Sequence, residues 1–397
     1  MRRLRPILLA IVVTTGVVAT APSRLAAPPK WVQRIDDVVG RDTVSVTIGY
    51  EGTVLYRHKD WVRRAPASNE KLLLSMALLD QVPPDTTIPT RVLATKAVRG
   101  DGTLRGDLWI VGHGDPETDR QDLAALAADL RERGVERVRG RVMGPTGPFG
   151  RDWFAPGWKS YFPRYYIALP TALTYHYNRG PRGTNIRDPE RRAAAELTKQ
   201  LQQRGIKVRG KPGMGVPPGN LVGLATQLSE PFVSIMRRMN VFSSNFRAEV
   251  FGKFLGARVG GRGTIARGAR AIEAFTKAHG VGVEANDGSG LSYANRVSTE
   301  GIVELLWVAD ASPWGETLRG TLAQGGQGTL EDRLRDVKIR AKTGTLTDIS
   351  ALSGWVWLER EDAWAEFSIL SQGMSKTRSI QIENAIVRVV NANAAPR

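Results

Sequence analysis

The chain has 397 residues, no cysteine and a formal net charge of +17, with 42% hydrophobic and 24% charged residues. This length and composition exclude a chain that is disordered throughout, and they predict a large core and two structural parts. Because cysteine is absent, disulfides, thiol nucleophiles and cysteine metal sites are excluded as well.

The positive charge points to an acidic partner. In an exported protein such a charge favours contact with anionic lipid heads or acidic wall polymers. Nucleic acid is the other standard explanation. The basic residues are spread along the chain without a dense block or interleaved aromatic residues, and export argues against that partner. We therefore expect no nucleic acid, and the sequence leaves the oligomeric state open.

The first segment, residues 1–27, is typical of an export signal. Arg2, Arg3 and Arg5 precede an apolar run from residue 7 to residue 21, which is short for a membrane span. Cleavage after Ala19 and retention as an uncleaved anchor both stay open. Either outcome predicts an exported protein of the cell envelope, in the periplasm or at the outer side of the cytoplasmic membrane.

Two short strands and a helix are predicted next. Residues 43–50 alternate between apolar and polar types, and residues 53–57 run back after the Glu51-Gly52 turn, as in a β-hairpin. The run of residues 68–79 predicts a helix, which ends before Pro83-Pro84.

Residues 84–222 show a different pattern, which we interpret as an inserted smaller α/β domain. An aromatic cluster at residues 152–166 predicts a packed lid or small core, and residues 210–219 predict a connecting loop. The predicted strands and helices of this insertion are residues 88–98, 103–111, 120–133, 135–143 and 188–204. No internal repeat is apparent by inspection.

The chain after residue 222 is mainly helical and then ends in strands and a helix. The predicted elements are helices at 231–239, 246–255, 264–279 and 300–309, strands at 337–343, 349–358 and 364–371, and a helix at 377–391. Strands from both chain ends, with helices between them, predict an antiparallel sheet covered by helices. Residues 28–83 and 223–397 would then form one catalytic domain around the insertion.

Ser68 and Lys71 stand at the start of the predicted helix. Residues three apart lie on the same face of a helix, so the lysine amine can reach the serine hydroxyl and take its proton. Alone this spacing is a weak signal, because a serine at a helix start is more often a cap.

Two further motifs strengthen this signal. Ser243-Ser244-Asn245 lies in the break between two predicted helices, and Lys342-Thr343-Gly344-Thr345 lies at the end of a predicted strand. The patterns Ser-x-x-Lys, Ser-x-Asn and Lys-Thr-Gly each occur once, in this order.

The three motifs resemble the signature of penicillin-recognising serine enzymes. Their flanks are similar to class C low-molecular-mass penicillin-binding proteins, the D-alanyl-D-alanine carboxypeptidase/endopeptidase group (peptidase S13). The similar segments are residues 66–72, 106–109, 114–116, 239–240, 248–249, 287–292 and 340–346. The resemblance implies the fold shared by these proteins and serine β-lactamases, an antiparallel sheet covered by helices with an inserted smaller α/β domain. Two departures are a shorter insertion and Ser244, where aspartate is common.

The resemblance also implies roles for individual residues. Ser68 is expected to attack the penultimate D-alanine carbonyl of peptidoglycan stem peptides, and Lys71 to act as the base. Lys71 must be neutral for this step, and we expect burial and the charge of Lys342 to lower its pKa. The other implied catalytic residues are Ser243, as proton relay, and Asn245, which holds Lys71 or the substrate amide.

Substrate binding is assigned by the same resemblance. Lys342 and Thr343 are expected to grip the terminal carboxylate, and Gly344 to let the peptide lie along the strand edge. The N–H groups of Ser68 and Thr345 are expected to form the oxyanion hole. β-Lactams are the expected inhibitors, because they form a long-lived acyl-enzyme in this family.

The sequence gives less support to other chemistries and functions. The four histidines have no metal-ligand spacing, so neither a metal nor a cofactor is expected, and Asp287–Ser292 is interpreted as a structural turn. The alternatives are a β-lactamase or esterase of the same fold, or a non-catalytic wall-binding homologue. The sequence does not identify the diamino acid of the substrate or divide carboxypeptidase from endopeptidase activity.

Overall fold

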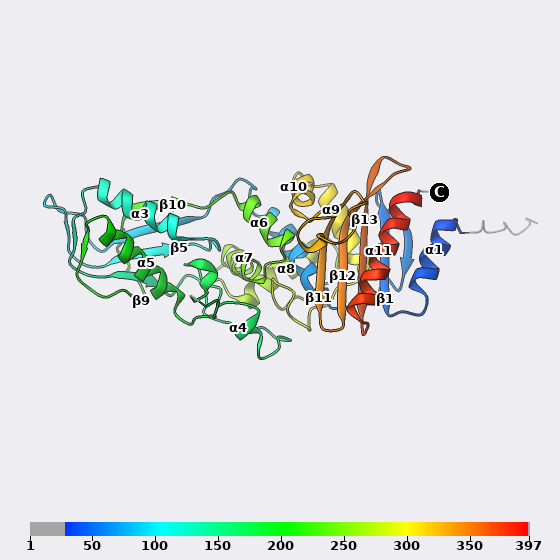
Figure 1. Ribbon diagram of the computed structural model, residues 1–397, viewed down its shortest axis with the longest axis horizontal. Coiled ribbons are helices and arrows are strands. Elements are labelled where there is room, and N and C mark those ends of the chain that lie inside the picture. The colour runs from blue at the N-terminus through cyan, green and yellow to red at the C-terminus, as the bar shows by residue number, and fades with distance from the viewer. Residues whose placement is uncertain (1–27, 181, 396–397) are drawn as a thin grey trace, which may run out of the picture.

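The computed structural model describes residues 28–180 and 182–395, so the predicted export signal at 1–27 lies outside the described residues. The molecule is elongated, with a five-stranded sheet near one end, the insertion at the other and helices between them (Figure 1). Within these ranges, no helix combines the length and apolar character that a bilayer span requires.

The first sheet unites the two ends of the described chain. Its strands run in the order β11 (Ile339–Leu346), β12 (Ile349–Leu358), β13 (Ala363–Gln372), β1 (Val44–Tyr50) and β2 (Thr53–His58), with all neighbours antiparallel. β1 pairs with β13, so that Val46 lies opposite Ile369. The predicted antiparallel sheet is therefore confirmed.

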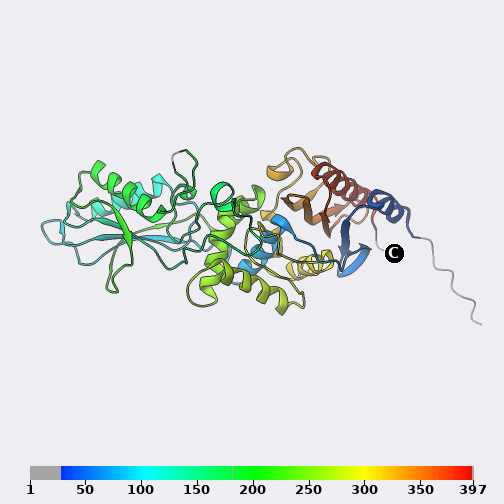
Figure 2. The same ribbon diagram turned by 90° about the horizontal axis from the view of Figure 1, so that it is seen from below.

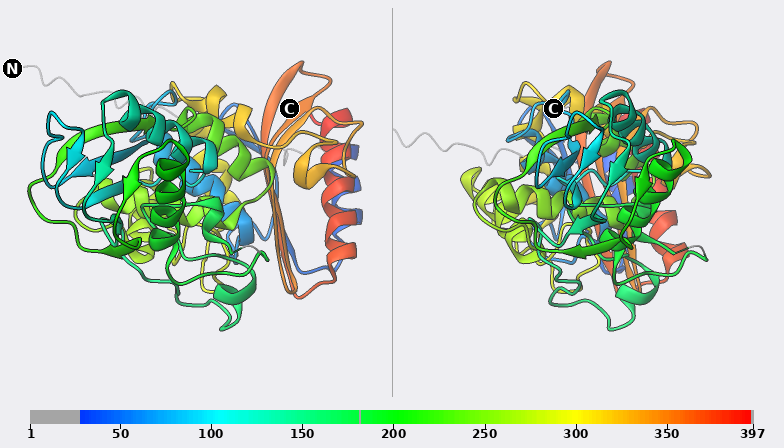
Figure 3. Two further views of the ribbon diagram at one scale, coloured as in Figure 1. Left: turned by 60° about the vertical axis from the view of Figure 1, so that its left-hand side comes forward. Right: turned by 90° about the vertical axis from the view of Figure 1, so that its left-hand side faces the viewer.

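Helices cover both faces of this sheet. α11 (Lys376–Asn393) packs on β12, and α1 (Lys30–Val39) packs beside α11 (Figure 3). α1 was not predicted, although its buried residues Trp31, Ile35 and Val39 follow a helical spacing of four. On the opposite face, α9 (Thr299–Asp310) packs against β1 and β13.

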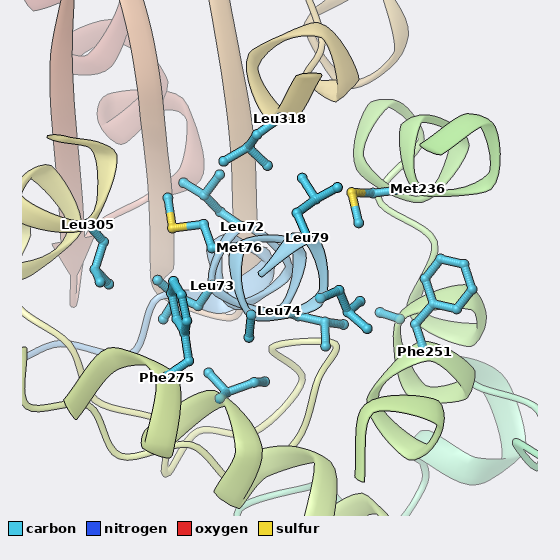
Figure 4. Packing of buried hydrophobic residues seen from close by; sticks show 14 of the residues in the cluster. Leu72, Leu73, Leu74, Met76, Leu79, Met236, Phe251, Phe275, Leu305 and Leu318 are labelled. Atoms are coloured by element: carbon cyan, nitrogen blue, oxygen red, sulfur yellow. The ribbon is translucent and has the colours of Figure 1, made fainter. Parts of the chain in front are cut away.

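α2 (Glu70–Leu79) is the centre of the helical layer, and all of its residues are buried. Helices α6 (Phe232–Val241), α7 (Asn245–Arg258), α8 (Ile265–Ala278) and α10 (Gly315–Thr321) also belong to this layer. Figure 4 shows leucines of α2 pointing in several directions, towards neighbours such as Leu305, Leu318 and Phe251. Leu→Ala changes in such a core typically cost about 2–5 kcal/mol. The residues at the start of α2 are therefore held by a rigid support.

The insertion contains two sheets and a core of its own. One sheet has the order β10 (Val222–Leu228), β3 (Pro89–Ala94), β5 (Leu108–Gly112), β7 (Val142–Pro145) and β9 (Gly213–Gly215). The other has three parallel strands, β4 (Thr103–Leu104), β6 (Arg137–Val138) and β8 (Lys207–Val208). Their apolar residues pack with those of α3 (Arg120–Glu132) and α5 (Pro189–Gln203).

Several predicted boundaries in the insertion were wrong. The predicted strands 103–111 and 135–143 are each two strands, because the chain leaves the three-stranded sheet and enters the five-stranded one. Gly106, with φ +117°, makes the first of these transitions. β9 lies inside the expected loop 210–219, and β10 extends the insertion's sheet to Leu228, beyond residue 222.

Candidate active site

Ser68 lies in a short 3₁₀ turn, η1 (Ala67–Asn69), directly before α2. Glycines let two neighbouring segments approach this turn closely. A Cβ on Gly290, whose φ is +78°, would lie 1.9 Å from the Ala67 carbonyl oxygen, and one on Gly344 would lie 2.8 Å from the Pro66 carbonyl oxygen. The sequence analysis expects the missing side chain of Gly344 to make space for the substrate peptide. In the structure, the turn that carries Ser68 occupies the space beside Gly344.

The Lys71 amine contacts the nucleophile and two other oxygens. Its Nζ lies 2.9 Å from Ser68 Oγ, 2.8 Å from Asn245 Oδ1 and within hydrogen-bond distance of the Ser289 carbonyl. An amide oxygen and a backbone carbonyl only accept hydrogen bonds, so they engage both N–H groups of a neutral amine. The remaining lone pair then points at the Ser68 hydroxyl, which is the geometry of a general base.

Burial lowers the pKa of Lys71 to about 8, although the charges of Asp287, Glu249 and Glu70 act in the opposite direction. Burial also raises the pKa of Glu249 to about 8, helped by the charge of Asp287, and places that of Glu70 well above its usual value. Carboxyl groups that stay protonated cannot stabilise the charged form of a neighbouring lysine. The surroundings of Lys71 therefore favour a lowered pKa and the neutral amine.

Glu249 also positions the third partner of Lys71. Its Oε1 accepts hydrogen bonds from the N–H groups of Gly288 and Ser289, at 3.0 and 2.8 Å. Asp287 holds the same turn, because its oxygens accept hydrogen bonds from the N–H groups of Gly290 and Ser292, both at 2.9 Å. The turn is structural, as expected, and it also supplies the carbonyl that orients Lys71.

Ser243 and Lys342 form the second pair. Ser243 has φ +53° in the break between α6 and α7, and its Oγ accepts a hydrogen bond from Lys342 Nζ at 2.9 Å. Burial, together with the charge of Lys71, lowers the pKa of Lys342 well below its usual value. The sequence analysis expects the charge of Lys342 to lower the pKa of Lys71. In the structure the charge of Lys71 instead lowers the pKa of Lys342.

Ser244, the departure from the family pattern, has a local role. It is the N-cap of α7, and its Oγ accepts a hydrogen bond from the Arg247 N–H at 3.4 Å. Serine and aspartate are both good N-cap residues. The cap therefore keeps Asn245 at the first turn of α7, facing Lys71.

The free edge of β11 presents backbone groups to the site. The Ala341 N–H donates to the Ala323 carbonyl outside the sheet, at 2.9 Å. Because backbone groups on a strand alternate with period two, the N–H groups of Thr343 and Thr345 point to the same edge. This direction is the one that an oxyanion donor at Thr345 and an added peptide strand require.

A cavity of about 970 Å³ opens onto these groups. It is lined by Ser68, Ser243, Asn245, Thr343 and Thr345 from the predicted motifs. The predicted aromatic lid forms another part of its wall, through Tyr161, Phe162 and Tyr166 around the short helix α4 (Phe162–Tyr165).

The sequence analysis missed two contributors to the site. The Ser289 carbonyl has no sequence signature, because every residue carries one. Glu249 was noted only as part of a matching segment, and its proximity to the turn at Gly288 depends on how α7 packs. Across the described ranges, no group of three or more histidines or carboxylates is arranged to hold a metal ion.

Comparison with known proteins identifies relatives that cover most of the chain. A family model described as the D-Ala-D-Ala carboxypeptidase 3 (S13) family matches residues 36–184 and 166–393. A D-alanyl-D-alanine carboxypeptidase of Actinomadura sp. (strain R39) is 28% identical over 431 residues, which cover 84% of this chain and 78% of that protein. A carboxypeptidase of Mycobacterium tuberculosis is 29% identical over 370 residues, covering 85% and 77% respectively.

A solved structure shows the same fold. Penicillin binding protein 4 of Haemophilus influenzae aligns with a TM-score of 0.78 at 18% sequence identity, covering 90% of this chain and 99% of that one. This similarity confirms the predicted fold class.

Proposed function

Because the chain belongs to the D-Ala-D-Ala carboxypeptidase 3 (S13) family, as its motifs predicted, we propose that its reaction proceeds through an acyl-enzyme on Ser68. The protein is a serine-type D-Ala-D-Ala carboxypeptidase of the penicillin-binding class. The observation that supports Ser68 most strongly is the position of Lys71 Nζ, 2.9 Å from the hydroxyl and buried beside two other acceptors.

Acylation uses the first pair of residues. Ser68 Oγ attacks the carbonyl carbon of the penultimate D-alanine while its proton passes to neutral Lys71. The carbonyl oxygen becomes negative and is stabilised by the N–H groups of Ser68 and Thr345, a contribution typically worth a few kcal/mol per donor. Asn245 keeps the amine of Lys71 in place throughout.

Release of the terminal D-alanine uses the second pair. Ser243 accepts a hydrogen bond from Lys342, which leaves its own O–H free to donate to the leaving nitrogen. The proton taken up by Lys71 replaces the one that Ser243 gives away. The C–N bond breaks, and water then attacks the ester on Ser68 while Lys71 accepts its proton. The ester C–O bond breaks, and Ser68 Oγ takes that proton back from Lys71. The products are the shortened peptide and free D-alanine.

Lys342 and Thr343 hold the terminal carboxylate in this proposal. An approaching carboxylate stabilises the ammonium form, so substrate binding opposes the lowering of the Lys342 pKa by burial. Gly344 contributes by letting β11 approach Ser68. The substrates are peptidoglycan stem peptides, and β-lactams acylate the same serine as inhibitors.

Cleavage of peptide cross-links is a second activity that we propose for the same site. The cavity continues past Thr345 to Asp348 and Lys376, and its volume of about 970 Å³ exceeds what a departing alanine needs. A leaving group longer than alanine therefore has room.

The remaining assignments concern location and organisation. We place the enzyme in the cell envelope, where its substrate lies, and propose that its basic surface contacts anionic lipid heads or acidic wall polymers. We also propose the division into a catalytic domain (28–83 and 223–397) and an inserted domain (84–222), with β10 extending the sheet of the inserted domain across that boundary to Leu228. The separate apolar cores around α2 and around α3 and α5 support this division.

Intact-mass measurement after mixing with benzylpenicillin tests the proposal. We expect a stable adduct on the native chain, none on Ser68→Ala, and an unchanged adduct on Ser160→Ala, which alters an exposed serine outside the cavity lining. Rapid penicillin turnover without an adduct would favour a β-lactamase. A complete absence of reaction would favour a non-catalytic wall-binding protein.

A further inference from the structure

Three strands of the insertion carry the same short pattern, an aliphatic residue followed by Arg-Gly. The copies in these strands are Leu104-Arg105-Gly106, Val138-Arg139-Gly140 and Val208-Arg209-Gly210, and the pattern also occurs outside them, for example at residues 98–100 and 318–320. They are the parallel strands β4, β6 and β8 with their continuations, in register side by side. The ladder continues through them, because the Arg139 N–H donates to the Leu104 carbonyl and the Arg209 N–H to the Val138 carbonyl.

The first and third positions of this three-residue pattern, the aliphatic residue and the glycine, have a structural explanation. Leu104, Val138 and Val208 face the core beneath α3 and α5. Among the glycines, a Cβ on Gly140 would lie 2.3 Å from the Gly106 carbonyl oxygen, so this close approach excludes larger residues. The arginines point the opposite way, into solvent, and packing gives no reason for them.

The outward side of this sheet is strongly basic. We call it the arginine face, formed by Arg105, Arg137, Arg139, Lys207 and Arg209, all of them exposed. Neighbouring strands lie about 4.8 Å apart, so the three arginines of one row are held at that spacing. Within the described ranges none of the five has a carboxylate partner; the nearby pair Arg141–Asp107, at 3.6 Å, lies beside them. Like charges opposite each other destabilise a sheet, so the stability of the sheet does not explain this row of arginines.

We propose that the arginine face binds a linear phosphate polymer of the cell wall. Guanidinium groups bind phosphate through two parallel hydrogen bonds, which makes arginine better suited than lysine to this role. A single phosphate ion can satisfy only part of an array this wide, whereas a phosphodiester chain presents anionic groups repeatedly along its length. This proposal specifies the wall-polymer contact proposed above, and it rests on the location of the enzyme in the envelope.

Three observations favour a polymer over the other anionic surfaces. None of the large apolar side chains that are exposed in the described chain belongs to β4, β6 or β8, whereas proteins that lie on membranes insert such side chains. The aromatic side chains on which single-stranded nucleic acids stack are absent from these described strands too. The insertion also lies at the opposite end of the molecule from α1 (Figure 2), so the arginine face is far from the N-terminal end of the described chain.

The test measures binding of the full chain to poly(glycerol phosphate) over a range of salt concentrations. The key variant combines Arg105→Ser, Arg139→Ser and Arg209→Ser. The matched control combines Arg41→Ser, Arg270→Ser and Arg360→Ser, which removes the same charge from exposed positions outside any ion pair in the described chain. We expect the key variant to bind roughly a hundredfold more weakly, and the slope of log affinity against log salt to fall by about two to three.

Benzylpenicillin acylation and the unfolding temperature are measured alongside and should be unchanged in both variants. Equal binding by the key variant and the control would overturn the proposal, as would no binding by the native chain at low salt. Tighter binding to phosphatidylglycerol vesicles or duplex DNA than to the polymer would also overturn it. Acylation reports on Ser68 alone, so a failure of the proposed catalytic function would be seen separately from a failure of polymer binding.

Discussion

The cations of the catalytic cleft and those of the arginine face differ in burial, and this difference separates their functions. Lys71 and Lys342 are fully buried, and burial lowers the pKa of both, so burial favours the neutral form of each amine. Arg105, Arg139 and Arg209 are exposed, and a guanidinium group keeps its charge at any physiological pH. The net charge of +17 therefore includes buried cations whose charge depends on their surroundings and exposed cations whose charge is permanent.

The largest expected effect comes from giving the cleft a cation that cannot lose its proton. Lys71→Arg keeps the charge and removes the base, and we expect the rate of acylation by benzylpenicillin to fall by about 10³–10⁴-fold. Stopped-flow measurement of adduct formation checks this. Lys253→Arg is the control for a buried lysine, because the Lys253 amine binds oxygens of Gly150, Asp152 and Pro170 and not the Ser68 hydroxyl. A rate within tenfold of the native one for Lys71→Arg would contradict its role as base.

The second effect concerns the carboxylate grip. Lys342→Gln removes the cation, and we expect kcat/KM for a peptide ending in free D-Ala-D-Ala to fall by about a hundredfold, since lost charge pairs of this kind cost roughly 2–5 kcal/mol. A peptide with an amidated C-terminus is the matched substrate and should lose much less. Equal losses on both substrates would assign Lys342 to proton transfer or folding instead.

The third effect is a pH profile. Because the pKa of Lys71 is lowered to about 8 and the neutral amine is the active form, the acylation rate should rise with pH and level off above about 8. With an uncharged thioester as substrate, which removes the contribution of Lys342, we expect a gain of roughly tenfold between pH 7 and pH 9. A rate that is flat across this range would show that Lys71 is already neutral or plays no part.

The smallest effect is at the arginine face. Arg139→Lys keeps the charge at an exposed position but loses the bidentate fork, and we expect poly(glycerol phosphate) to bind about two- to fivefold more weakly. Isothermal titration can measure this, with Arg270→Lys as control. Acylation by benzylpenicillin should not change. An affinity equal to that of the native chain would mean that the arginine face attracts the polymer through charge alone, without bidentate hydrogen bonds.

The fold was predictable where the pattern was long and regular. The first sheet and α2 followed from alternation and from a continuous apolar run. The insertion was harder, because strands of two residues such as β4 and β6 lie next to β5 and β7 in the chain but belong to another sheet. Alternation alone cannot detect the point at which a chain changes sheets.

The site was predictable to the extent that its chemistry depends on side-chain identity. Ser68, Lys71, Ser243, Asn245 and Lys342 were selected by motif, and the structure brings them into two hydrogen-bonded groups. The orientation of the Lys71 lone pair depends on the Ser289 carbonyl, and backbone atoms leave no trace in a sequence. The Arg-Gly copies were overlooked because they are short and far apart, and only the register of β4, β6 and β8 aligns them.

The pairing of β1 with β13 has a consequence for how the chain folds. The central strands of the first sheet come from opposite ends of the described sequence, so that sheet cannot close until its last strands have been synthesised. Contacts this distant in sequence make folding slow, because a long loop must close before they stabilise anything. A nascent chain of this topology therefore stays without its first sheet, and without the apolar core between that sheet and α11, until its last strands and α11 have been made.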